Sequence, residues 1–528
     1  MGDFLKNRWV LVVVLTLFVM FKIPHILYPF YWDESWPYVP AIKEMYRNGI
    51  SLMPGAIDPN LSRGHPLFFH AMAAIWMHIF GISNKSLHLF ALFISILFLI
   101  TIYEAGYRIF NKRVAIIALL LVATHVSFFV QSSFVLFEVL VAFLCFLSIY
   151  LYAKEKYALA AISLTALFLT KESGMIVGFV IGIDAVISLF NKNIPLKTKL
   201  LKLMPVTVSC IVIGAFFVIQ KHVSGWYVLP LYTDTILTKW PAIWYRFRES
   251  SIETTFCQGY EYIIFIALLI FCVITVIKKR TLKSLALSVV IVPVFFVYCF
   301  INGGRSEIFD SLNITMPVFL AFIAFYMFTL YVYCAPAYFE TAVQRKFILL
   351  LGFFILCFIL FSSVSYFIPR YLLASIVPAL FLLAVFLDML MRHSSPMLYY
   401  PLLAVIAVAA FLSFKESKGW SDGEMGFFYG LKTETGIVEF MERSNFYDKY
   451  IAASYLNEQH LKDRNTGFLT SDHNFKNVGY DITPNTELII FDNIEFDKRY
   501  YGIANNSSYE LIYRIVIRDN WSEIYKKK

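Results

Sequence analysis

Long apolar runs separated by short polar segments make up most of the chain and predict a bundle of membrane-spanning helices. The chain has 528 residues, of which 59% are hydrophobic and only 15% are charged, whereas soluble domains carry about 25% charged residues. A helix needs roughly 20 apolar residues to cross a bilayer, and we expect about thirteen such helices. They lie near residues 9–30, 87–106, 114–131, 134–153, 157–171, 173–190, 201–219, 260–277, 284–301, 311–333, 347–365, 370–391 and 397–414. The pattern therefore predicts a polytopic α-helical membrane protein.

Clusters of Lys and Arg between the apolar runs predict how the helices are oriented. The clusters are Lys6/Arg8, Arg108/Lys112/Arg113, Lys154/Lys156, Lys192/Lys197/Lys199/Lys202, Lys278/Lys279/Arg280/Lys283, Arg345/Lys346 and Arg392. Short loops rich in Lys and Arg face the cytoplasm, so an even number of crossings must separate neighbouring clusters. The N-terminus is then inside and the C-terminus outside. The net charge of +9 reflects this topology rather than nucleic-acid binding.

One apolar segment, residues 66–81, does not fit this series of crossings. It has sixteen residues and is broken by His70 and His78, which makes it too short to span a bilayer. A crossing here would also turn every later basic cluster outward. We therefore predict an external juxtamembrane or re-entrant helix within a first large external loop, residues 31–86. Residues 220–260 form a second external loop, and both loops belong to a transmembrane catalytic domain of residues 1–414.

Residues 415–528 are polar and mixed in charge, with no apolar run long enough to span. Residues 450–453 and 487–491 have the composition of buried strands, and residues 509–518 alternate like a half-exposed strand. Residues 435–442 have helical spacing, with Thr435 as the N-cap. This pattern predicts a small extracytoplasmic α/β domain, which serves as a lid, as an acceptor platform or simply as a folded tail.

Two adjacent acids, Asp33 and Glu34, stand at the end of the first apolar run. An ionised carboxylate at the bilayer centre costs roughly 3 kcal/mol or more, so acids at the edge of a span face water, protein or a substrate. The Tyr and Trp residues around the pair are typical of a membrane–water interface. The alternative is that the two acids begin a solvated loop or cap a helix.

Several cationic side chains fall on the same predicted outer side as the acidic pair. They are Arg63, His65, Lys171, Lys221, His222, Arg305 and Arg370. Taken singly, each is better explained as an interfacial charge that reaches toward the headgroups. Arg305 lies in a Gly-rich turn, whose backbone amides can approach an anion. The convergence of these charges on one side favours a functional role.

Acids and cations on one face suit the transfer of a sugar from a phosphate-linked lipid. The acceptor hydroxyl loses its proton as it attacks the anomeric carbon, which requires a carboxylate base. The departing lipid phosphate gains charge, which requires Arg, Lys or His donors. Asp33 or Glu34 supplies the base, and the cations of the outer side supply the donors. A single displacement would invert the anomeric centre.

Four segments of the chain resemble the GT-C glycosyltransferases, most closely the protein O-mannosyltransferases and the lipid A aminoarabinose transferases. They are the external Asp33-Glu34 pair, Arg63-Gly64-His65-Pro66-Leu67-Phe68 entering a helix, the junction Leu169-Thr170-Lys171-Glu172, and Arg370-Tyr371-Leu372-Leu373 opening a late span. The similarity covers residues 5–400 in the order of the spans. The chain departs from the family in its second segment, where relatives often have Lys-Pro-Pro-Leu or His-Pro-Pro-Leu and one Pro is missing here.

The resemblance implies a polyprenyl-phosphate sugar as the donor and transfer on the extracytoplasmic side of the membrane. It puts the acidic pair at the active site, with Asp33 as the base and Glu34 as its alternate or orienting partner. Lys171 and Arg370 match basic positions near the lipid phosphate, with Tyr371 beside them.

Five further residues complete the predicted site. Arg63 and His65 are candidates for the lipid phosphate, although the departure in their segment leaves open which cation touches it. Relatives often carry an acid at the outer end of the fourth span, where Glu138 lies one turn in; it binds sugar or acceptor, or it is a buried acid satisfied by a neighbouring helix. His222 and Arg305 are the remaining candidates for binding substrate.

The sequence also predicts partners and location. No HExxH or HxxxH spacing is present and the resemblance implies no metal, so we expect no cofactor, with a divalent ion at His65, His70 and the acids as the alternative. Expected partners are membrane lipids, the polyprenyl-phosphate sugar and a protein, lipid or glycan acceptor. We expect a monomer in the inner (cytoplasmic) membrane of a bacterial cell envelope.

Three other functions compete with sugar transfer. A transporter or lipid flippase would place charges inside the bundle and often shows internal repeats, whereas here Asp184 and Asp388 are the notable charges within spans and no repeat is evident. A polymerase or ligase of surface polysaccharide would typically act on diphosphate-linked oligosaccharides. In a structural or receptor role, the C-terminal domain would carry the function.

Overall fold

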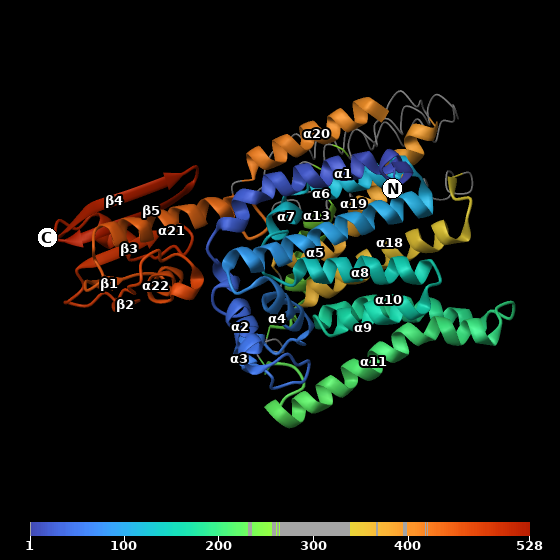
Figure 1. Ribbon diagram of the computed structural model, residues 1–528, viewed down its shortest axis with the longest axis horizontal. Coiled ribbons are helices and arrows are strands. Elements are labelled where there is room, and N and C mark those ends of the chain that lie inside the picture. Colours follow the sequence, from blue (N-terminus) through green and yellow to red (C-terminus); the bar gives the residue numbers. More distant parts are fainter. Residues whose placement is uncertain are drawn as a thin grey trace.

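The computed structural model describes residues 2–230, 235–255, 260, 263, 338–365, 368–393, 399–417, 419 and 421–528. In this part of the chain, helices form an elongated body, and a mixed α/β domain projects from one end of it (Figure 1). The predicted spans 260–277, 284–301 and 311–333 and the candidate residue Arg305 lie outside the described residues.

The helices of the body run roughly side by side (Figure 1). They are α1 (Gly2–Lys22), α5 (Asn84–Ala105), η3 (Gly106–Phe110), α6 (Lys112–Ala123), α7 (Val126–Gln131), α8 (Glu138–Ala153), α9 (Tyr157–Phe168), η4 (Glu172–Gly174), α10 (Met175–Phe190), α11 (Leu196–Ser224), α13 (Trp240–Thr255), α18 (Ala342–Val364), η5 (Pro369–Leu372), α19 (Leu373–His393) and α20 (Tyr399–Glu416).

Among the described residues, six helical segments are long and apolar enough to cross a membrane. They are Arg8–Leu27, Asn84–Phe110, Glu172–Phe190, Leu196–Ser224, Ala342–Val364 and Pro369–Arg392. Shorter apolar helices cover Phe68–Phe80, Glu138–Ala153, Tyr157–Phe168 and Tyr399–Lys415. The body is therefore helical and apolar as predicted, whereas the count of about thirteen spans stays a prediction.

The apolar run at 114–131 does not form one continuous helix. α6 ends at Ala123, and the hydroxyl of Thr124 donates to the carbonyl of Leu120 at 2.7 Å. His125 then has an extended backbone, with ψ of 125°, before α7 begins at Val126. Two polar residues thus divide the run, and the short second helix is left to contact the C-terminal domain.

The first external loop folds as a series of short helices at the end of the body nearest the C-terminal domain (Figure 1). These are η1 (Ile23–Leu27), which leads into it, η2 (Trp32–Glu34), α2 (Tyr38–Asn48), α3 (Pro59–Ser62) and α4 (Phe68–Phe80). α4 corresponds to the predicted juxtamembrane segment and has only 13 residues. It ends at Gly81, whose φ of 87° suits glycine at the end of a helix.

The C-terminal domain contains a five-stranded sheet with the order β2-β1-β3-β5-β4. The strands are β1 (Tyr450–Ala452), β2 (Asn477–Gly479), β3 (Leu488–Asp492), β4 (Tyr509–Ile517) and β5 (Asn520–Lys527). β1 is parallel to β2 and β3, whereas β5 is antiparallel to β3 and β4. Its helices are α21 (Gly426–Arg443), α22 (Tyr455–Lys462) and α23 (Tyr500–Ala504), and a short turn, η7 (Arg464–Thr466), follows α22. The three strands predicted from the sequence are present, and β2 and β5 are additional.

The predicted N-cap at Thr435 is wrong. α21 begins at Gly426, and the hydroxyl of Thr435 donates to the carbonyl of Leu431 at 2.8 Å inside the helix. The helix starts earlier because its first turn packs on the body: the rings of Phe427 and Phe428 lie 4.9 and 5.3 Å from the ring of Phe134. Burial of these aromatic rings stabilises a first turn that the sequence pattern alone does not reveal.

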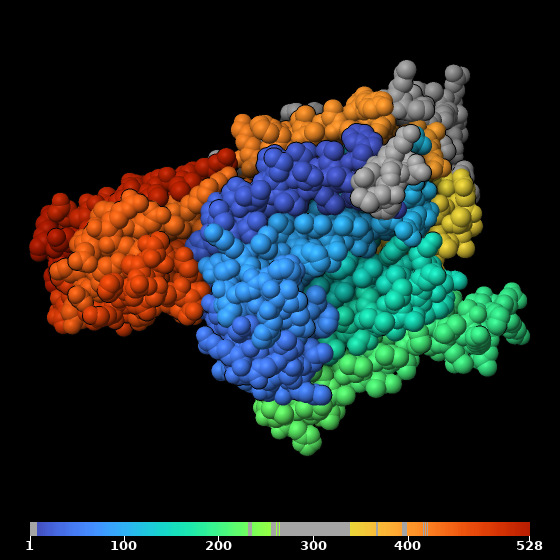
Figure 2. All heavy atoms as spheres, viewed as in Figure 1, coloured from blue at the N-terminus to red at the C-terminus, as the bar shows by residue number. Residues whose placement is uncertain are grey.

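Hydrogen bonds join the C-terminal domain to the first external loop. The backbone N–H of Phe30 donates to the carbonyl of Thr466 at 2.7 Å, and the hydroxyl of Tyr31 donates to Glu434 Oε1 at 2.8 Å. In Figure 2 the surface of the loop, in blue, adjoins that of the domain, in orange and red. The loop and the domain therefore share one end of the body, as the predicted topology requires.

A buried acid, Asp388, joins several helices near the C-terminal end of α19. Its Oδ1 lies 2.9 Å from Arg113 Nε, and its Oδ2 lies 3.3 Å from Arg392 Nε. Oδ2 also accepts hydrogen bonds from Asn111 at 2.7 Å and from the hydroxyl of Tyr338 at 2.8 Å. The acid is fully buried, whereas both arginines are 35% exposed.

Two other acids are bridged in the same way. Glu104 lies 2.7 Å from Arg8 and 2.6 Å from Arg108, and Asp184 lies 3.4 Å from Lys346. The basic residues that set the predicted orientation therefore also bind helices of the body together.

Candidate active site

The two neighbouring acids of η2 point in different directions. Trp32 has φ of 52°, a left-handed backbone that costs a residue other than glycine roughly 1 kcal/mol or more. The Asp33 carboxylate reaches Arg370 on η5 and keeps 20% of its side-chain surface exposed, whereas the Glu34 side chain is 1% exposed. The acidic pair therefore divides into two groups with different surroundings.

Glu34 fixes the external loop onto the body. Its Oε1 accepts from the backbone N–H of Val135 at 2.6 Å and lies 3.2 Å from His88 Nε2. Its Oε2 accepts from the backbone N–H of Tyr31 at 3.2 Å. A carboxylate held on both oxygens is suited to orient the turn rather than to take a proton from a substrate, so this geometry favours Asp33 as the base.

Arg370 lies at the centre of a buried ionic cluster. Its side chain is 2% exposed, Nη2 donates to Asp33, Nη1 donates to Asp422, and Nε lies 3.4 Å from Glu138 Oε1. The planar guanidinium presents donors on each of its edges, which is why one arginine can hold three carboxylates. The external loop, the start of α8 and the chain leading to the C-terminal domain all meet at this residue.

Lys171 extends the cluster on the side of Glu138. Its Nζ lies 3.5 Å from Glu138 Oε1 and sits over the rings of Tyr371 and Phe137, at 3.7 and 4.3 Å from their centroids. The structure therefore brings Lys171, Arg370, Tyr371, Glu138 and Asp33 together.

Arg63 and His65 lie on the turn that enters α4. His65 Nδ1 lies 2.7 Å from Glu172 Oε2, and its ring packs edge-on against Phe137 at 5.1 Å. The guanidinium of Arg63 lies over the ring of Trp36 at 5.0 Å. His65 thus shares the ring of Phe137 with Lys171, whereas Arg63 extends toward a different aromatic side chain.

The second external loop packs against this turn. A Cβ added to Gly64, whose φ is 71°, would lie only 3.0 Å from the Cβ of Leu229 and 3.1 Å from the ring of Trp226. His222, a predicted candidate, is exposed in the last turn of α11. Within the described part of the chain no hydrogen bond or ion pair joins it to Arg370, so its role stays a prediction.

Asp422 is the member of the cluster that the sequence analysis missed. It lies between α20 and α21, on the C-terminal side of the predicted domain boundary, and is 7% exposed. Its Oδ1 has no hydrogen-bond partner among the described residues. Burial raises the pKa of Asp422; Glu138 and Asp33 add to this effect, and Arg370 opposes it. Only the turn-like triplet Ser421-Asp422-Gly423 marks the position in the sequence.

Three carboxylates outnumber the two cations of this cluster. Asp33 is the most exposed of the three acids, with 20% of its side chain accessible against 3% for Glu138 and 8% for Asp422. An accessible carboxylate beside buried cations can accept a proton from an incoming hydroxyl while the cations hold an anion.

The carboxylates face Arg370, and among the described residues no His, Cys, Asp or Glu side chains are grouped to hold a metal ion. The expectation of no cofactor stays a prediction.

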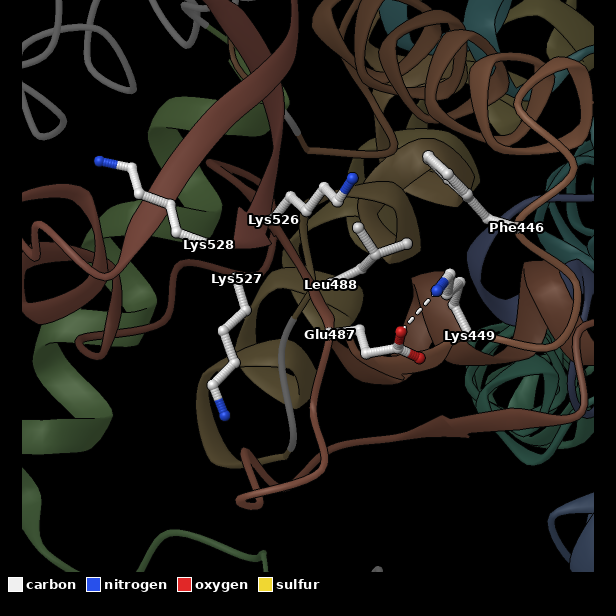
Figure 3. A pocket seen from close by; sticks show the side chains of 7 residues that line it. All are labelled: Phe446, Lys449, Glu487, Leu488, Lys526, Lys527 and Lys528. Carbon is white, nitrogen blue, oxygen red and sulfur yellow. Dashed lines mark hydrogen bonds and ion pairs between the residues drawn. The ribbon is translucent and has the colours of Figure 1, made fainter.

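A pocket of about 230 Å³ in the C-terminal domain is lined by other residues. They are Phe446, Lys449, Glu487, Leu488, Lys526, Lys527 and Lys528. Lys449 pairs with Glu487 at 2.6 Å, and Figure 3 shows Lys526 leaning toward Phe446 while Lys527 and Lys528 point away from it. Because the lysines do not converge, this pocket is a weaker candidate for binding an anion than the Arg370 cluster.

The arrangement of helices and C-terminal domain is similar to that of membrane proteins of known structure. ArnT from Cupriavidus metallidurans, bound to undecaprenyl phosphate, matches with a TM-score of 0.50 at 13% identity, over 99% of this chain and 98% of that chain. The apo form of the same protein gives 0.49 with the same coverage. The Archaeoglobus fulgidus oligosaccharyltransferase in its apo form gives 0.46 at 13% identity, over 92% of this chain and 70% of that one. At such identity the ArnT match shows the fold.

A family profile points the same way. Residues 64–218 match the family described as dolichyl-phosphate-mannose-protein mannosyltransferase. This region runs from the turn before α4 into α11 and includes His65, Glu138 and Lys171. No curated protein sequence matches the chain. The fold shared with ArnT and the profile match over residues 64–218 agree with the predicted resemblance to the GT-C glycosyltransferases.

Proposed function

We propose that the protein is an inverting glycosyltransferase that moves a sugar from a polyprenyl-phosphate-linked donor to an acceptor on the extracytoplasmic face of the membrane. The observation that carries this proposal is the Arg370 cluster, in which the accessible Asp33 carboxylate adjoins buried Arg370 and Glu138 links Arg370 to Lys171. The undecaprenyl phosphate bound to ArnT supports a lipid phosphate as the sugar carrier.

Asp33 acts as the general base. The acceptor hydroxyl approaches the exposed side of its carboxylate and transfers its proton as the hydroxyl oxygen bonds to the anomeric carbon. A positioned base of this kind contributes typically 10²–10⁴-fold to the rate. Glu34 holds the η2 turn, through the backbone of Val135 and Tyr31, so that Asp33 keeps this position.

Arg370 and Lys171 stabilise the leaving group. The bond between the anomeric carbon and the phosphate oxygen breaks on the face opposite the acceptor, and its electron pair stays on the phosphate. Charged donors in a buried site stabilise this growing charge strongly. An ammonium has three donors, so Lys171 can keep its contact with Glu138 and still bind a phosphate oxygen.

The test uses the purified full chain in nanodiscs with radiolabelled polyprenyl-phosphate hexose and a cell-envelope extract as the source of acceptor. We expect label to move from the lipid to an acceptor and the anomeric configuration of the product, measured by NMR, to be inverted. A product with retained configuration would contradict the single displacement. In a parallel liposome assay, movement of the lipid across the bilayer without sugar transfer would identify a flippase instead.

A further inference from the structure

Each edge of the buried Arg370 guanidinium faces a carboxylate, although Nε makes no hydrogen bond among the described residues. Nη1 donates to Asp422, Nη2 donates to Asp33, and Nε faces Glu138 Oε1 at 3.4 Å. Because the Arg370 side chain is only 2% exposed, a lipid phosphate reaches its donors most directly by taking the place of one carboxylate. Without such an exchange, a further anion would enter a site where acids already outnumber cations, and like charges at close range repel strongly in a buried site.

Glu138 is not suited to leave. It is the first residue of α8, its side chain is 3% exposed, and its Oε1 contacts both Lys171 and Arg370. Moving it would break two ion pairs at the end of a packed helix. Asp33 has to stay beside the donor, because it is the base of the proposed reaction, and Glu34 holds the turn that carries it.

Asp422 is the carboxylate that can move at least cost. It lies outside the helices, and the bonds that hold its segment are made to backbone carbonyls of the segment and not to the Asp422 side chain. Gln131 Nε2 donates to the Asp422 carbonyl, and the Ser127 hydroxyl donates to the Gly423 carbonyl at 3.1 Å. Its Oδ1 has no hydrogen-bond partner among the described residues. A change of rotamer therefore breaks one ion pair and leaves the segment attached.

We propose that Asp422 is the displaceable counter-ion of Arg370. In the donor-free protein the Asp422 carboxylate occupies the Nη1 edge of Arg370, and the donor phosphate takes this place when it binds. This inference rests on the proposed function, because the displacing ligand is the phosphodiester of a lipid-linked sugar. It assigns a role to the link between the body and the C-terminal domain. The same domain also holds Tyr31, two residues before the base, through Glu434 on α21.

The surroundings of Asp422 support the exchange. The charged groups that face it are Arg370 on η5, Glu138 on α8 and Asp33 on η2, so two of its three neighbours are acids. When the phosphate takes Arg370, these acids remain and the arginine no longer compensates the Asp422 charge. Loss of this compensation raises the pKa of the displaced carboxylate further, beyond the effect of burial and of its acidic neighbours, and so favours proton uptake.

The experiment measures binding of polyprenyl-phosphate hexose to the full chain in nanodiscs, without acceptor. In Asp422→Asn the side chain is of similar size but uncharged, so it competes less with the phosphate. We expect the donor to bind about tenfold more tightly than to wild type, because the weakened ion pair no longer has to be broken. Asp472→Asn is the matched control, since its side chain is 89% exposed and lies outside the cluster, and we expect it to leave the affinity unchanged.

A second measurement uses the wild-type protein alone and holds even where the variant fails to fold. Calorimetric titration with the same donor, in two buffers of different ionisation enthalpy, reports protons taken up on binding. We expect uptake at neutral pH, because a phosphodiester itself does not titrate there.

The outcomes are distinguishable. Unchanged or weaker donor binding to folded Asp422→Asn, or binding to wild type without proton uptake, would overturn the counter-ion role and leave the proposed function standing. Donor binding to neither protein would contradict the proposed function, and the counter-ion role with it.

Discussion

Two buried ionic clusters adjoin opposite ends of α19, and they have opposite charge balance. At one end Arg370 meets three carboxylates, whereas at the other Asp388 meets two arginines. Arg370 and Asp388 lie about 27 Å apart along the chain if the segment between them rises as an α-helix. The two arginines of the Asp388 cluster are 35% exposed, so their excess charge reaches solvent or headgroups.

The excess charge of the Arg370 cluster has no such outlet. Glu138 and Asp422 are nearly buried, and one oxygen of each has no hydrogen-bond partner among the described residues. Asp388 Oδ1 also lacks a hydrogen-bond partner among the described residues, but it lies 2.9 Å from Arg113 Nε, and Oδ2 lies 3.3 Å from Arg392 Nε. Both oxygens of Asp388 therefore face a cation, whereas Asp422 Oδ1 and Glu138 Oε2 have no ion pair within the described part of the chain. The two clusters thus differ in where their excess charge lies: at Asp388 it is on arginines that reach the surface, whereas at Arg370 it stays buried, as the proposed chemistry requires.

Removal of Arg370 should have the largest effect. Arg370→Ala leaves three neighbouring carboxylates without their common partner, and breaking a buried ion pair in this way costs about 3–5 kcal/mol. We expect a large fall in the unfolding temperature together with loss of sugar transfer. Arg392→Ala is the matched variant at the other cluster, where Arg113 remains to pair with Asp388. A similar loss of stability in both variants would remove the distinction between the clusters.

Asp388→Asn should affect stability but not chemistry. The amide keeps the size of the side chain but loses the charge that holds Arg113 and Arg392, and hydrogen bonds to charged groups contribute about 1.5–3 kcal/mol. We expect a lower unfolding temperature, measured in nanodiscs, and an unchanged transfer rate per folded molecule. A lower transfer rate per folded molecule would show that this cluster takes part in the reaction.

A smaller, pH-dependent effect is expected at the junction of the C-terminal domain. Burial raises the pKa of Glu434 to about 8 from its ordinary 4.5, so the folded protein holds this proton more tightly than the unfolded chain. Its contribution to stability therefore falls as the pH rises from 4.5 through 8. His460, 2.7 Å away, has a pKa lowered by burial to about 3, and burial raises the pKa of nearby Asp492 to about 6. Between pH 6.5 and 8 the histidine is neutral in the folded protein and loses its charge in the unfolded chain, so a variant of Glu434 is needed to isolate the contribution of Glu434.

The measurement is the unfolding temperature across pH 6.5 to 8. We expect it to fall with rising pH in the wild type and to fall less in Glu434→Gln. Glu439→Gln, on the same helix with a 46% exposed side chain, should keep the wild-type slope. Equal slopes in all three proteins would assign the pH dependence to another group.

The sequence allowed much of the cluster to be predicted. Asp33, Lys171, Arg370 and Tyr371 follow from the position of rare charges at the ends of apolar runs and from the resemblance to GT-C enzymes. These positions are local properties of the chain, because the boundary of a span can be read from a window of neighbouring residues.

Other features depend on contacts between distant residues. The separation of Asp33 from Glu34 results from the left-handed backbone of Trp32, which no composition rule predicts for a tryptophan. Asp422 pairs with Arg370 from beyond the last apolar helix, and its sequence neighbourhood indicates only a turn. Likewise β5 is polar in sequence and becomes a strand by pairing with β3 and β4.

The central claim is that Asp33 is the base of a sugar transfer at the Arg370 cluster, and single-turnover kinetics in nanodiscs test it most directly. With donor bound and acceptor added, Asp33→Asn should lower the transfer rate constant at least about 100-fold, without weaker donor binding. Asp448→Asn, whose side chain is 84% exposed, should match the wild type. Transfer by Asp33→Asn at the wild-type rate would contradict the account.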